Sequence, residues 1–200
     1  MADPTLTSPA AGTALSPLHR WSQTFAALAP AVTLAETPVA QVIIRTTDPQ
    51  VIAQLALPAA CESRTDGTEV ALWLGPDEWL LYRPGVAGHD YLAELTDRAG
   101  INADSSTRGT TYLLDTTGQR TRLVLGGEYA ATILAHGLSI DLAPESFGPD
   151  DAVQTLLAQT GVILHRLPTP ETGFALLVRS SFADYLAHWL VDASLEYRSQ

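Results

Sequence analysis

The sequence contains no lysine, and all eleven of its basic residues are arginine. Schiff-base chemistry on lysine and the lysine of a phosphate-binding P-loop are therefore excluded. Arginine suits planar, two-pronged pairing with carboxylates better than lysine does. Acidic residues number 22, so the formal net charge is −11. This balance argues against a nucleic-acid or anionic-membrane partner, because either would need a basic patch.

Cysteine is almost absent, since Cys61 is the single one. One cysteine excludes an internal disulfide and a cysteine-based metal cage, and it favours a cytoplasmic location. As a nucleophile Cys61 has Glu62 and Arg64 nearby but no recognisable base. No apolar run approaches 18 residues and no basic-then-apolar leader is present, so neither a membrane span nor a signal peptide is predicted.

Hydrophobic residues make up 46% of the 200-residue chain, enough to bury a core in one domain or two small lobes. The most organised stretch is residues 71–82, called the Trp hairpin below. Trp73 and Trp79 lie in two apolar runs separated by a four-residue break, Gly75, Pro76, Asp77 and Glu78. Pro76 suits the second position of a turn and favours a loop longer than two residues. Because its runs are apolar on both faces, we expect this hairpin to be covered on each side.

Apolar periodicity and turn residues predict an α+β chain. Helices are expected at residues 16–29, 50–56, 89–99, 128–135 and 182–193, and further strands at 39–46, 110–115, 120–125, 153–159, 162–167 and 174–179. Loops are expected at 58–68, 102–109 and 141–150, and a turn at 160–161. The two similar series predict two ferredoxin-like lobes with mainly antiparallel sheets and helices on one face. The first lobe is assigned to residues 16–118 and the second to 119–200, after a disordered tail at 1–15.

The final helix has the clearest pattern in the chain. Ser181 and Asp184 form an Asp version of the capping box. One wide apolar stripe, which should lie flat on a sheet, contains Phe182, Tyr185, Leu186, Trp189, Leu190 and Ala193.

Candidate chemical groups are few. His165 lies in an apolar strand, where it is either a hydrogen-bonded core histidine or a ligand. Asp115 and Asp141 end a strand and a loop, where aspartate commonly satisfies backbone donors, although a carboxylate pair across the fold stays open. No catalytic, cofactor-binding or metal-binding constellation is assigned.

Arg120 and Arg122 alternate along one strand and therefore share a face. They either form the solvated, charged face of an edge strand or contact an acidic partner surface or a carboxylate.

Several stretches, taken in order, resemble the gamma subunit family of heterotetrameric sarcosine oxidases. The most specific are residues 72–81, which contain Trp73, Gly75, Pro76, Asp77 and Trp79, and residues 181–190, which contain Phe182, Tyr185 and Trp189. Residues 119–123, 134–142, 154–158 and 162–166 support them, so the resemblance spans roughly 18–195. The chain departs from the family at Leu138, where a cysteine is expected.

The resemblance implies a fold similar to that of the glycine-cleavage aminomethyltransferases. It implies a non-catalytic accessory subunit that binds no cofactor itself and assembles with alpha, beta and delta subunits. Those partners would carry FAD, FMN, NAD and tetrahydrofolate, and the complex would demethylate sarcosine to glycine, with hydrogen peroxide formed and a one-carbon unit passed to tetrahydrofolate.

Three alternatives stay open. The chain could be a free-standing folate- or one-carbon-binding protein, or an accessory subunit of a related N-methyl amino acid oxidase or dehydrogenase. The third is an independent enzyme using Asp115, Asp141 or His165.

Overall fold

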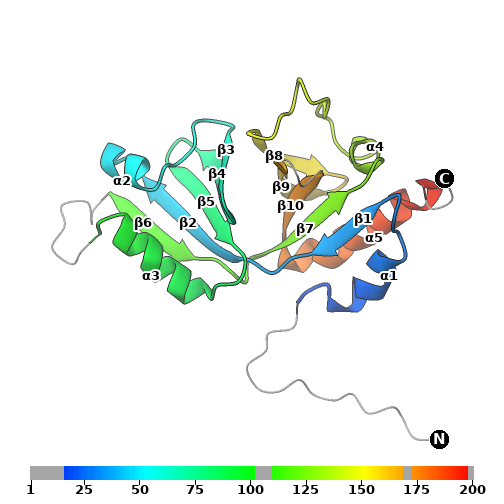
Figure 1. The fold of residues 1–200 in the computed structure, drawn as a ribbon, viewed down its shortest axis with the longest axis horizontal. Coiled ribbons are helices and arrows are strands. Elements are labelled where there is room, and N and C mark those ends of the chain that lie inside the picture. The colour runs from blue at the N-terminus through cyan, green and yellow to red at the C-terminus, as the bar shows by residue number, and fades with distance from the viewer. Residues whose placement is uncertain (1–15, 102–109, 169–172, 198–200) are drawn as a thin grey trace, which may run out of the picture.

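The computed structural model describes residues 16–101, 110–168 and 173–197, which form two five-stranded antiparallel sheets (Figure 1). The first lobe comprises β2 (Ala40–Thr46), α2 (Pro49–Gln54), β3 (Ser63–Asp66), β4 (Glu69–Gly75), β5 (Glu78–Arg83), α3 (Gly88–Arg98) and β6 (Thr111–Asp115). Its strand order is β3-β4-β5-β2-β6. The predicted loop at 102–109 and tail at 1–15 lie outside the described residues.

The second lobe has the strand order β1-β7-β10-β9-β8. Its elements are η1 (His19–Trp21), α1 (Ser22–Ala26), β1 (Thr33–Glu36), β7 (Arg120–Gly126), α4 (Ala130–Ala135), β8 (Ala152–Leu157), β9 (Thr160–Arg166), β10 (Phe174–Arg179), η3 (Ser180–Phe182), α5 (Ala183–Ala193) and η4 (Leu195–Tyr197). The α+β class and the antiparallel sheets are as predicted.

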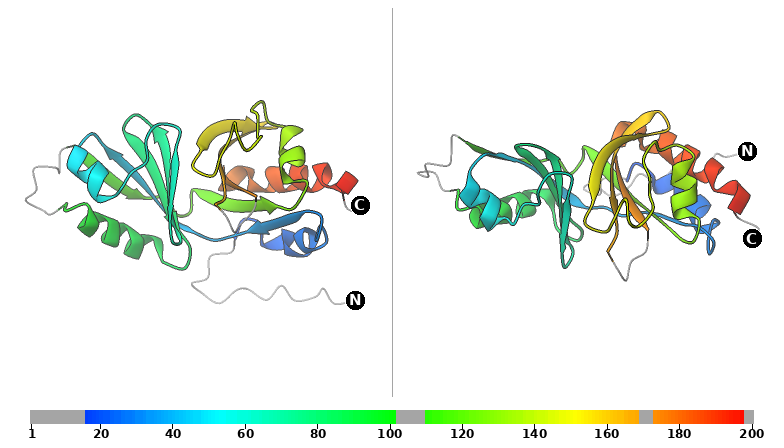
Figure 2. Two further views of the ribbon diagram at one scale, coloured as in Figure 1. Left: turned by 45° about the horizontal axis from the view of Figure 1, so that its top comes forward. Right: turned by 90° about the horizontal axis from the view of Figure 1, so that it is seen from above.

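The molecule is layered as helices, sheet, sheet, helices (Figure 2). Helices α2 and α3 cover the outer face of the first sheet, and α1, α4 and α5 cover that of the second. The inner faces pack against each other through a third buried cluster, formed by Val39, Val70, Leu72, Leu80, Tyr82, Ala152, Ile163 and Leu177. Each sheet is therefore covered on both faces, and the two lobes share a core.

The Trp hairpin forms β4 and β5 in the interior of the first sheet. Trp79 and Leu81 face α3, while Leu80 and Tyr82 face the second lobe, so the predicted covering of both faces is confirmed. The loop is not longer than two residues, however. Trp73 pairs with Trp79 and Gly75 with Glu78, so the register shifts at a bulge beside a two-residue turn. The bulge supplies the extra residue and twist that a turn with proline at its second position needs.

The N-terminal segment corrects the predicted lobe boundary. Strand β1, which the sequence did not predict, pairs with β7, and the side chains of Leu18, Trp21 and Phe25 lie in the core of the second lobe. Residues 16–36 therefore belong to the second lobe and not to the first. The predicted helix at 16–29 is shorter, a 3-10 turn followed by α1.

The chain crosses between the lobes at residues 37–39 and 116–119, and backbone pairing continues near both crossings. Thr37 N donates to Arg122 O at 2.9 Å, and Thr116 N donates to Gln41 O at 2.8 Å. The buried Gln41 side chain donates from Nε2 to Arg120 O at 2.6 Å. These bonds tie the end of each sheet to the start of the other.

Three further predictions are wrong in detail. Strand β3 lies within the predicted loop at 58–68, and the turn between β8 and β9 is Ala158 and Gln159, with Ala158 at φ 52. The final helix has no side-chain cap, because the Asp184 carboxylate instead accepts a hydrogen bond from Trp21 Nε1 at 2.8 Å.

The apolar stripe of that helix is also displaced. The buried residues of α5 are Ala183, Leu186, Ala187 and Leu190. Phe182 is 48% exposed and Tyr185 is 39% exposed, because the two small alanines turn toward the sheet in their place.

Candidate functional site

A groove of about 720 Å³ runs between the lobes beside their shared core. We call it the interlobe groove. It is lined by Thr33, Ala35, Thr37, Thr65, Gly67, Thr68, Val70, Tyr82, Pro84, Arg122, Val124, Gly126, Leu167 and Pro168. Its volume lies within the range of small-molecule sites, and most of its lining is apolar or hydroxyl-bearing.

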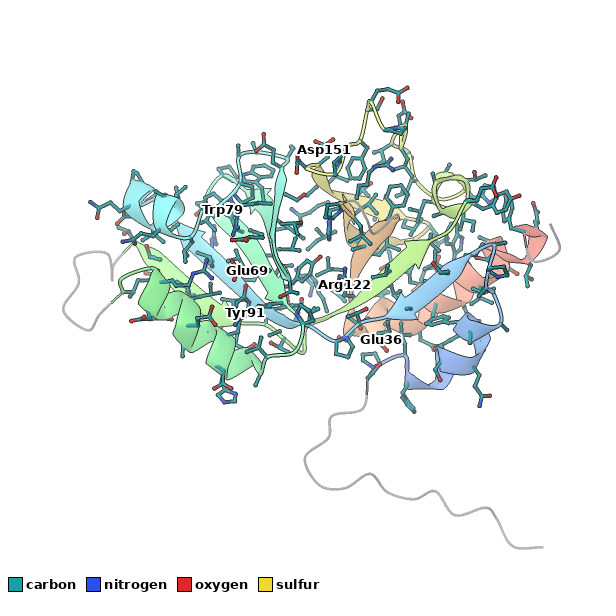
Figure 3. The ribbon with its side chains drawn as sticks, viewed as in Figure 1. Glu36, Glu69, Trp79, Tyr91, Arg122 and Asp151 are labelled. Carbon is teal, nitrogen blue, oxygen red and sulfur yellow. The ribbon has the colours of Figure 1, made fainter. Side chains whose placement is uncertain are left out.

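Arg122 is the cation in this groove, at the junction of the lobes (Figure 3). Its side chain projects from the inner face of β7, and its Cζ lies 5.3 Å from the centroid of the Tyr82 ring. The Arg122 Nε is buried and has no hydrogen-bond partner within the part of the chain that the structure describes. The guanidinium is thus held over an aromatic face with donor capacity left for an acceptor.

Tyr82 also contacts a buried histidine from the other lobe. The Tyr82 Oη and His165 Nε2 lie 2.6 Å apart, and His165 Nδ1 lies 3.3 Å from the backbone oxygen of Arg166. Burial, followed by the charge of Arg122, lowers the pKa of His165 from 6.5 to about 3, so the imidazole is neutral. With its Nδ1–H donating to Arg166 O, Nε2 accepts the Tyr82 hydroxyl. Of the two predicted roles for His165, the structure bears out the hydrogen-bonded core histidine.

The first lobe buries a second polar cluster, around Glu69, which the sequence analysis missed. The Glu69 carboxylate is 6% exposed at the residue level and accepts hydrogen bonds from Tyr91 Oη (2.9 Å) and Arg98 Nη1 (2.8 Å). Arg64 Nη2 adds a third at 3.3 Å. Burial alone raises the pKa of Glu69, but the bonds from Arg98 and Tyr91 outweigh it and the net pKa is lowered. These contacts bind the Glu69 carboxylate to other elements of the first lobe. In the sequence, the one sign of this cluster is that Glu69 is a charged residue at the start of an apolar strand.

The two stretches that carry the family resemblance, residues 72–81 and 181–190, do not form one site. Trp79 is 4% exposed and donates from Nε1 to Pro58 O at 2.9 Å, with half-buried Trp73 opposite it. Pro76 and Asp77 form the hairpin turn after Gly75, and Asp77 accepts a bond from Arg45 at 3.0 Å. Phe182, Tyr185 and half-buried Trp189 lie on the second lobe.

The other candidate groups are separate and locally bonded. Asp115 accepts bonds from Thr117 N (2.9 Å) and Oγ1 (2.6 Å), and Asp141 accepts bonds from Ala143 N (2.9 Å) and Ser146 Oγ (2.8 Å). Cys61 is exposed. Across the described residues, no group of three or more His, Cys, Asp or Glu side chains is placed to hold a metal ion.

One of the two interpretations placed Arg120 and Arg122 on an edge strand, and this interpretation is wrong. Strand β7 is flanked by β1 and β10, and both arginines point toward the inner face of the second sheet. The error has a clear cause: the strand that covers the edge of β7 comes from residues 33–36, far away in the sequence.

No helix within the described ranges has the length and apolar character needed to cross a membrane.

Comparison with known proteins gives consistent matches. The model of the "Sarcosine oxidase, gamma subunit family" matches residues 35–196. The sarcosine oxidase gamma subunits of Corynebacterium sp. (strain P-1) and Arthrobacter sp. are 37% and 36% identical over 135 and 137 residues. Those alignments cover 68% and 67% of this chain, and 61% and 60% of the relatives. The chain thus matches about 60% of the length of these curated relatives.

Solved structures agree with the sequence matches. A chain of the heterotetrameric sarcosine oxidase of Corynebacterium sp. U-96, in complex with pyrrole 2-carboxylate, superposes with a TM-score of 0.79 at 31% identity, covering 94% of this chain and 97% of that one. The glycine-cleavage aminomethyltransferase T of Bartonella henselae has a TM-score of 0.60 at 16% identity, covering 84% and 48%, and so shares the fold. On this evidence the chain belongs to the sarcosine oxidase gamma subunit family.

Proposed function

We propose that this chain is the gamma subunit of a heterotetrameric sarcosine-oxidase-type complex, and that it supports assembly without taking part in catalysis. The observation that carries the proposal is the superposition on a chain of a heterotetrameric sarcosine oxidase, which covers 94% of this chain and 97% of the other. The alpha, beta and delta partners would carry FAD, FMN, NAD and tetrahydrofolate in the cytoplasm, and would couple sarcosine demethylation to tetrahydrofolate.

The state of the titratable groups supports a non-catalytic role. His165 is neutral and fully buried, and its two ring nitrogens contact Tyr82 and the backbone of Arg166. Asp115 and Asp141 satisfy donors within five residues of themselves. A general acid or base needs access to a substrate proton, which the buried His165 does not have, and neither Asp115 nor Asp141 lines the interlobe groove.

The test is co-expression of the chain with the alpha, beta and delta subunits of a heterotetrameric sarcosine oxidase. We expect the four chains to elute together at a fixed stoichiometry, with flavin absorbance absent from the isolated gamma chain. A chain that never co-elutes with these partners would sink the proposal. Activity against a panel of N-methyl amino acids would then separate a sarcosine oxidase from a related oxidase or dehydrogenase.

The interlobe groove favours a second candidate, a folate- or one-carbon-binding module. Folate is an aromatic ring system with carboxylates, and the groove offers an apolar lining with the Arg122 guanidinium. Calorimetric titration of the isolated chain with tetrahydrofolate tests this function. A stoichiometric site that Arg122→Gln abolishes, and that Arg20→Gln on the outer helical side leaves intact, would support it. Heats equal to those of dilution would exclude it.

A further inference from the structure

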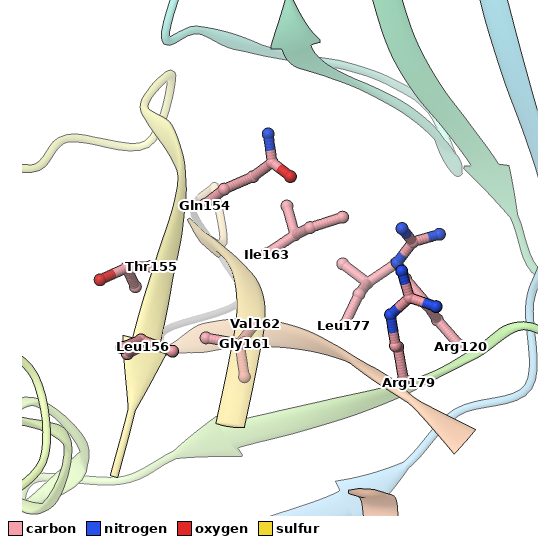
Figure 4. A pocket seen from close by; sticks show the side chains of 9 residues that line it. All are labelled: Arg120, Gln154, Thr155, Leu156, Gly161, Val162, Ile163, Leu177 and Arg179. Carbon is pink, nitrogen blue, oxygen red and sulfur yellow. The ribbon is translucent and has the colours of Figure 1, made fainter. Parts of the chain in front are cut away.

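Two arginines lie directly opposite each other on the inner face of the second sheet. Arg120 begins β7, Arg179 ends β10, and the antiparallel register pairs them. Both line an open pocket of about 370 Å³, which is also lined by Gln154, Ile163 and Leu177 (Figure 4). The figure shows the two guanidinium groups side by side, so two positive charges share one small recess.

Neither arginine has a carboxylate within 4.0 Å among the described residues. The Arg120 Nη1 donates to the neutral Gln119 side chain. Five other arginines, namely Arg20, Arg45, Arg64, Arg83 and Arg98, each form at least one ion pair with Asp or Glu. The acidic residue whose charge bears on Arg120 is Glu78, which itself lies 3.9 Å from Arg45. Arg122 and Arg166 also form no ion pair among the described residues, but Arg120 and Arg179 are the two that line one pocket together.

The pair costs the isolated chain stability. Like charges directly opposite each other on neighbouring strands repel. Burial, and then the charge of Arg179, lowers the pKa of Arg120, which indicates that its charged form is disfavoured where it lies. An anion seated between the two guanidinium groups would offset both costs, because each group can form two parallel hydrogen bonds to a carboxylate.

The shape of the recess favours a protein segment over a small molecule. Small-molecule sites bury most of the ligand surface. Here Leu156 at the rim is 63% exposed and Arg179 is exposed, so a small ligand would stay largely in water. The rim belongs to β8, the last strand of its sheet, which a second chain can reach without displacing any described element.

We propose that the Arg120–Arg179 pair binds the carboxylate of an acidic segment of a partner subunit, while the exposed Leu156 receives an apolar residue next to it. This inference rests on the proposed function, because the partner is another subunit of the complex. The sequence left open whether Arg120 contacts an acidic partner. The proposal places that contact in this recess and names Arg179 as a second residue that takes part in it.

The test compares Arg120→Gln/Arg179→Gln with a matched control, Arg20→Gln, in the co-expressed complex. The double variant should raise the Kd for the gamma chain, measured by dilution of the assembled complex, by at least about tenfold. The Kd of the double variant should also depend less steeply on NaCl concentration than that of the wild type, because fewer charge pairs are screened. The control should stay within about twofold. The isolated double variant should melt at the same temperature as the wild type or higher, which a purely structural role would not produce.

Two outcomes would overturn the inference while the proposed function stands. One is a double variant that assembles with the Kd and salt dependence of the wild type. The other is a rise in Tm of the isolated wild-type chain in millimolar succinate that the double variant loses, since this would assign the pair to a free carboxylate. Failure of the wild-type chain to assemble at all would instead reject the proposed function. Should the double variant not fold, the exposed Arg179→Gln alone should weaken assembly in the same direction.

Discussion

The hydroxyl of Tyr82 lies 2.6 Å from Nε2 of His165, and this contact joins the two lobes inside their shared core. Tyr82 comes from the Trp hairpin and His165 from β9, so the bond links residues 83 positions apart. A buried polar group is tolerated only when it is hydrogen-bonded. Each residue therefore depends on the other lobe being correctly docked.

Tyr82→Phe should lower the free energy of unfolding by about 1–3 kcal/mol, because it leaves the buried Nε2 of His165 without the hydroxyl. Urea denaturation of the isolated chain measures this loss. Tyr112→Phe is the matched control, since Tyr112 is 65% exposed, and it should change stability by less than about 0.5 kcal/mol. Equal stabilities for the two variants would contradict a structural role for the Tyr82 bond.

Stability should fall with acid through His165. Its pKa is lowered from 6.5 to about 3, so below pH 6.5 the unfolded chain takes up a proton that the folded protein does not. The stability present above pH 6.5 is therefore lost as the pH falls toward 3, at up to about 1.4 kcal/mol per pH unit.

Urea titrations at pH 7, 6 and 5 measure this slope. His165→Gln retains a hydrogen-bonding side chain but cannot titrate, so its slope between pH 6.5 and 5 should be shallower. The control is His89→Gln, because the His89 side chain is 81% exposed, and it should keep the wild-type slope. A wild-type slope in His165→Gln would show that another group causes the acid sensitivity.

Trp79→Ala should cost about 3–5 kcal/mol through the cavity it leaves, and complex assembly should then fail through misfolding. Trp79→Phe should cost less, although Pro58 O loses the bond from Nε1. Circular dichroism and thermal melting measure both variants. If Trp79→Ala melted normally and lost only partner binding, the Trp hairpin would be an interface element and not a packing element.

Glu69→Gln should destabilise the first lobe by about 2–3 kcal/mol, because Arg64 and Arg98 lose the buried charge they share. The expected cost is below the roughly 3–5 kcal/mol of a fully buried pair, since the Arg98 side chain remains 34% exposed and Glu94 lies 3.7 Å from it. Glu94→Gln is the control, and its side chain is 41% exposed, so the expected change is at most about 1 kcal/mol. Denaturant midpoints that shift equally would argue against the Glu69 cluster as a structural centre.

Local features could be predicted from the sequence because their causes lie within a few residues. The helix predicted at residues 50–56 is α2, which Asp48 caps by accepting a bond from Gln50 N at 2.8 Å. The helix predicted at 89–99 is α3, which is followed by Gly100 with φ +65. The Trp hairpin was found in the same way, from a proline turn between apolar runs. Each of these depends on steric preferences and on hydrogen bonds that short peptides already favour.

The sequence by itself thus determined the α+β class, the Trp hairpin and most strands, because side-chain periodicity reports which face of an element is buried. Only the tertiary structure decided that β1 joins β7, which moved residues 16–36 into the second lobe and Arg120 and Arg122 off a sheet edge. It alone brought Tyr82 to His165 and Arg120 to Arg179. Such pairings join segments far apart in the chain, and they leave no local pattern because their free energy comes from contacts that exist only after the lobes have docked.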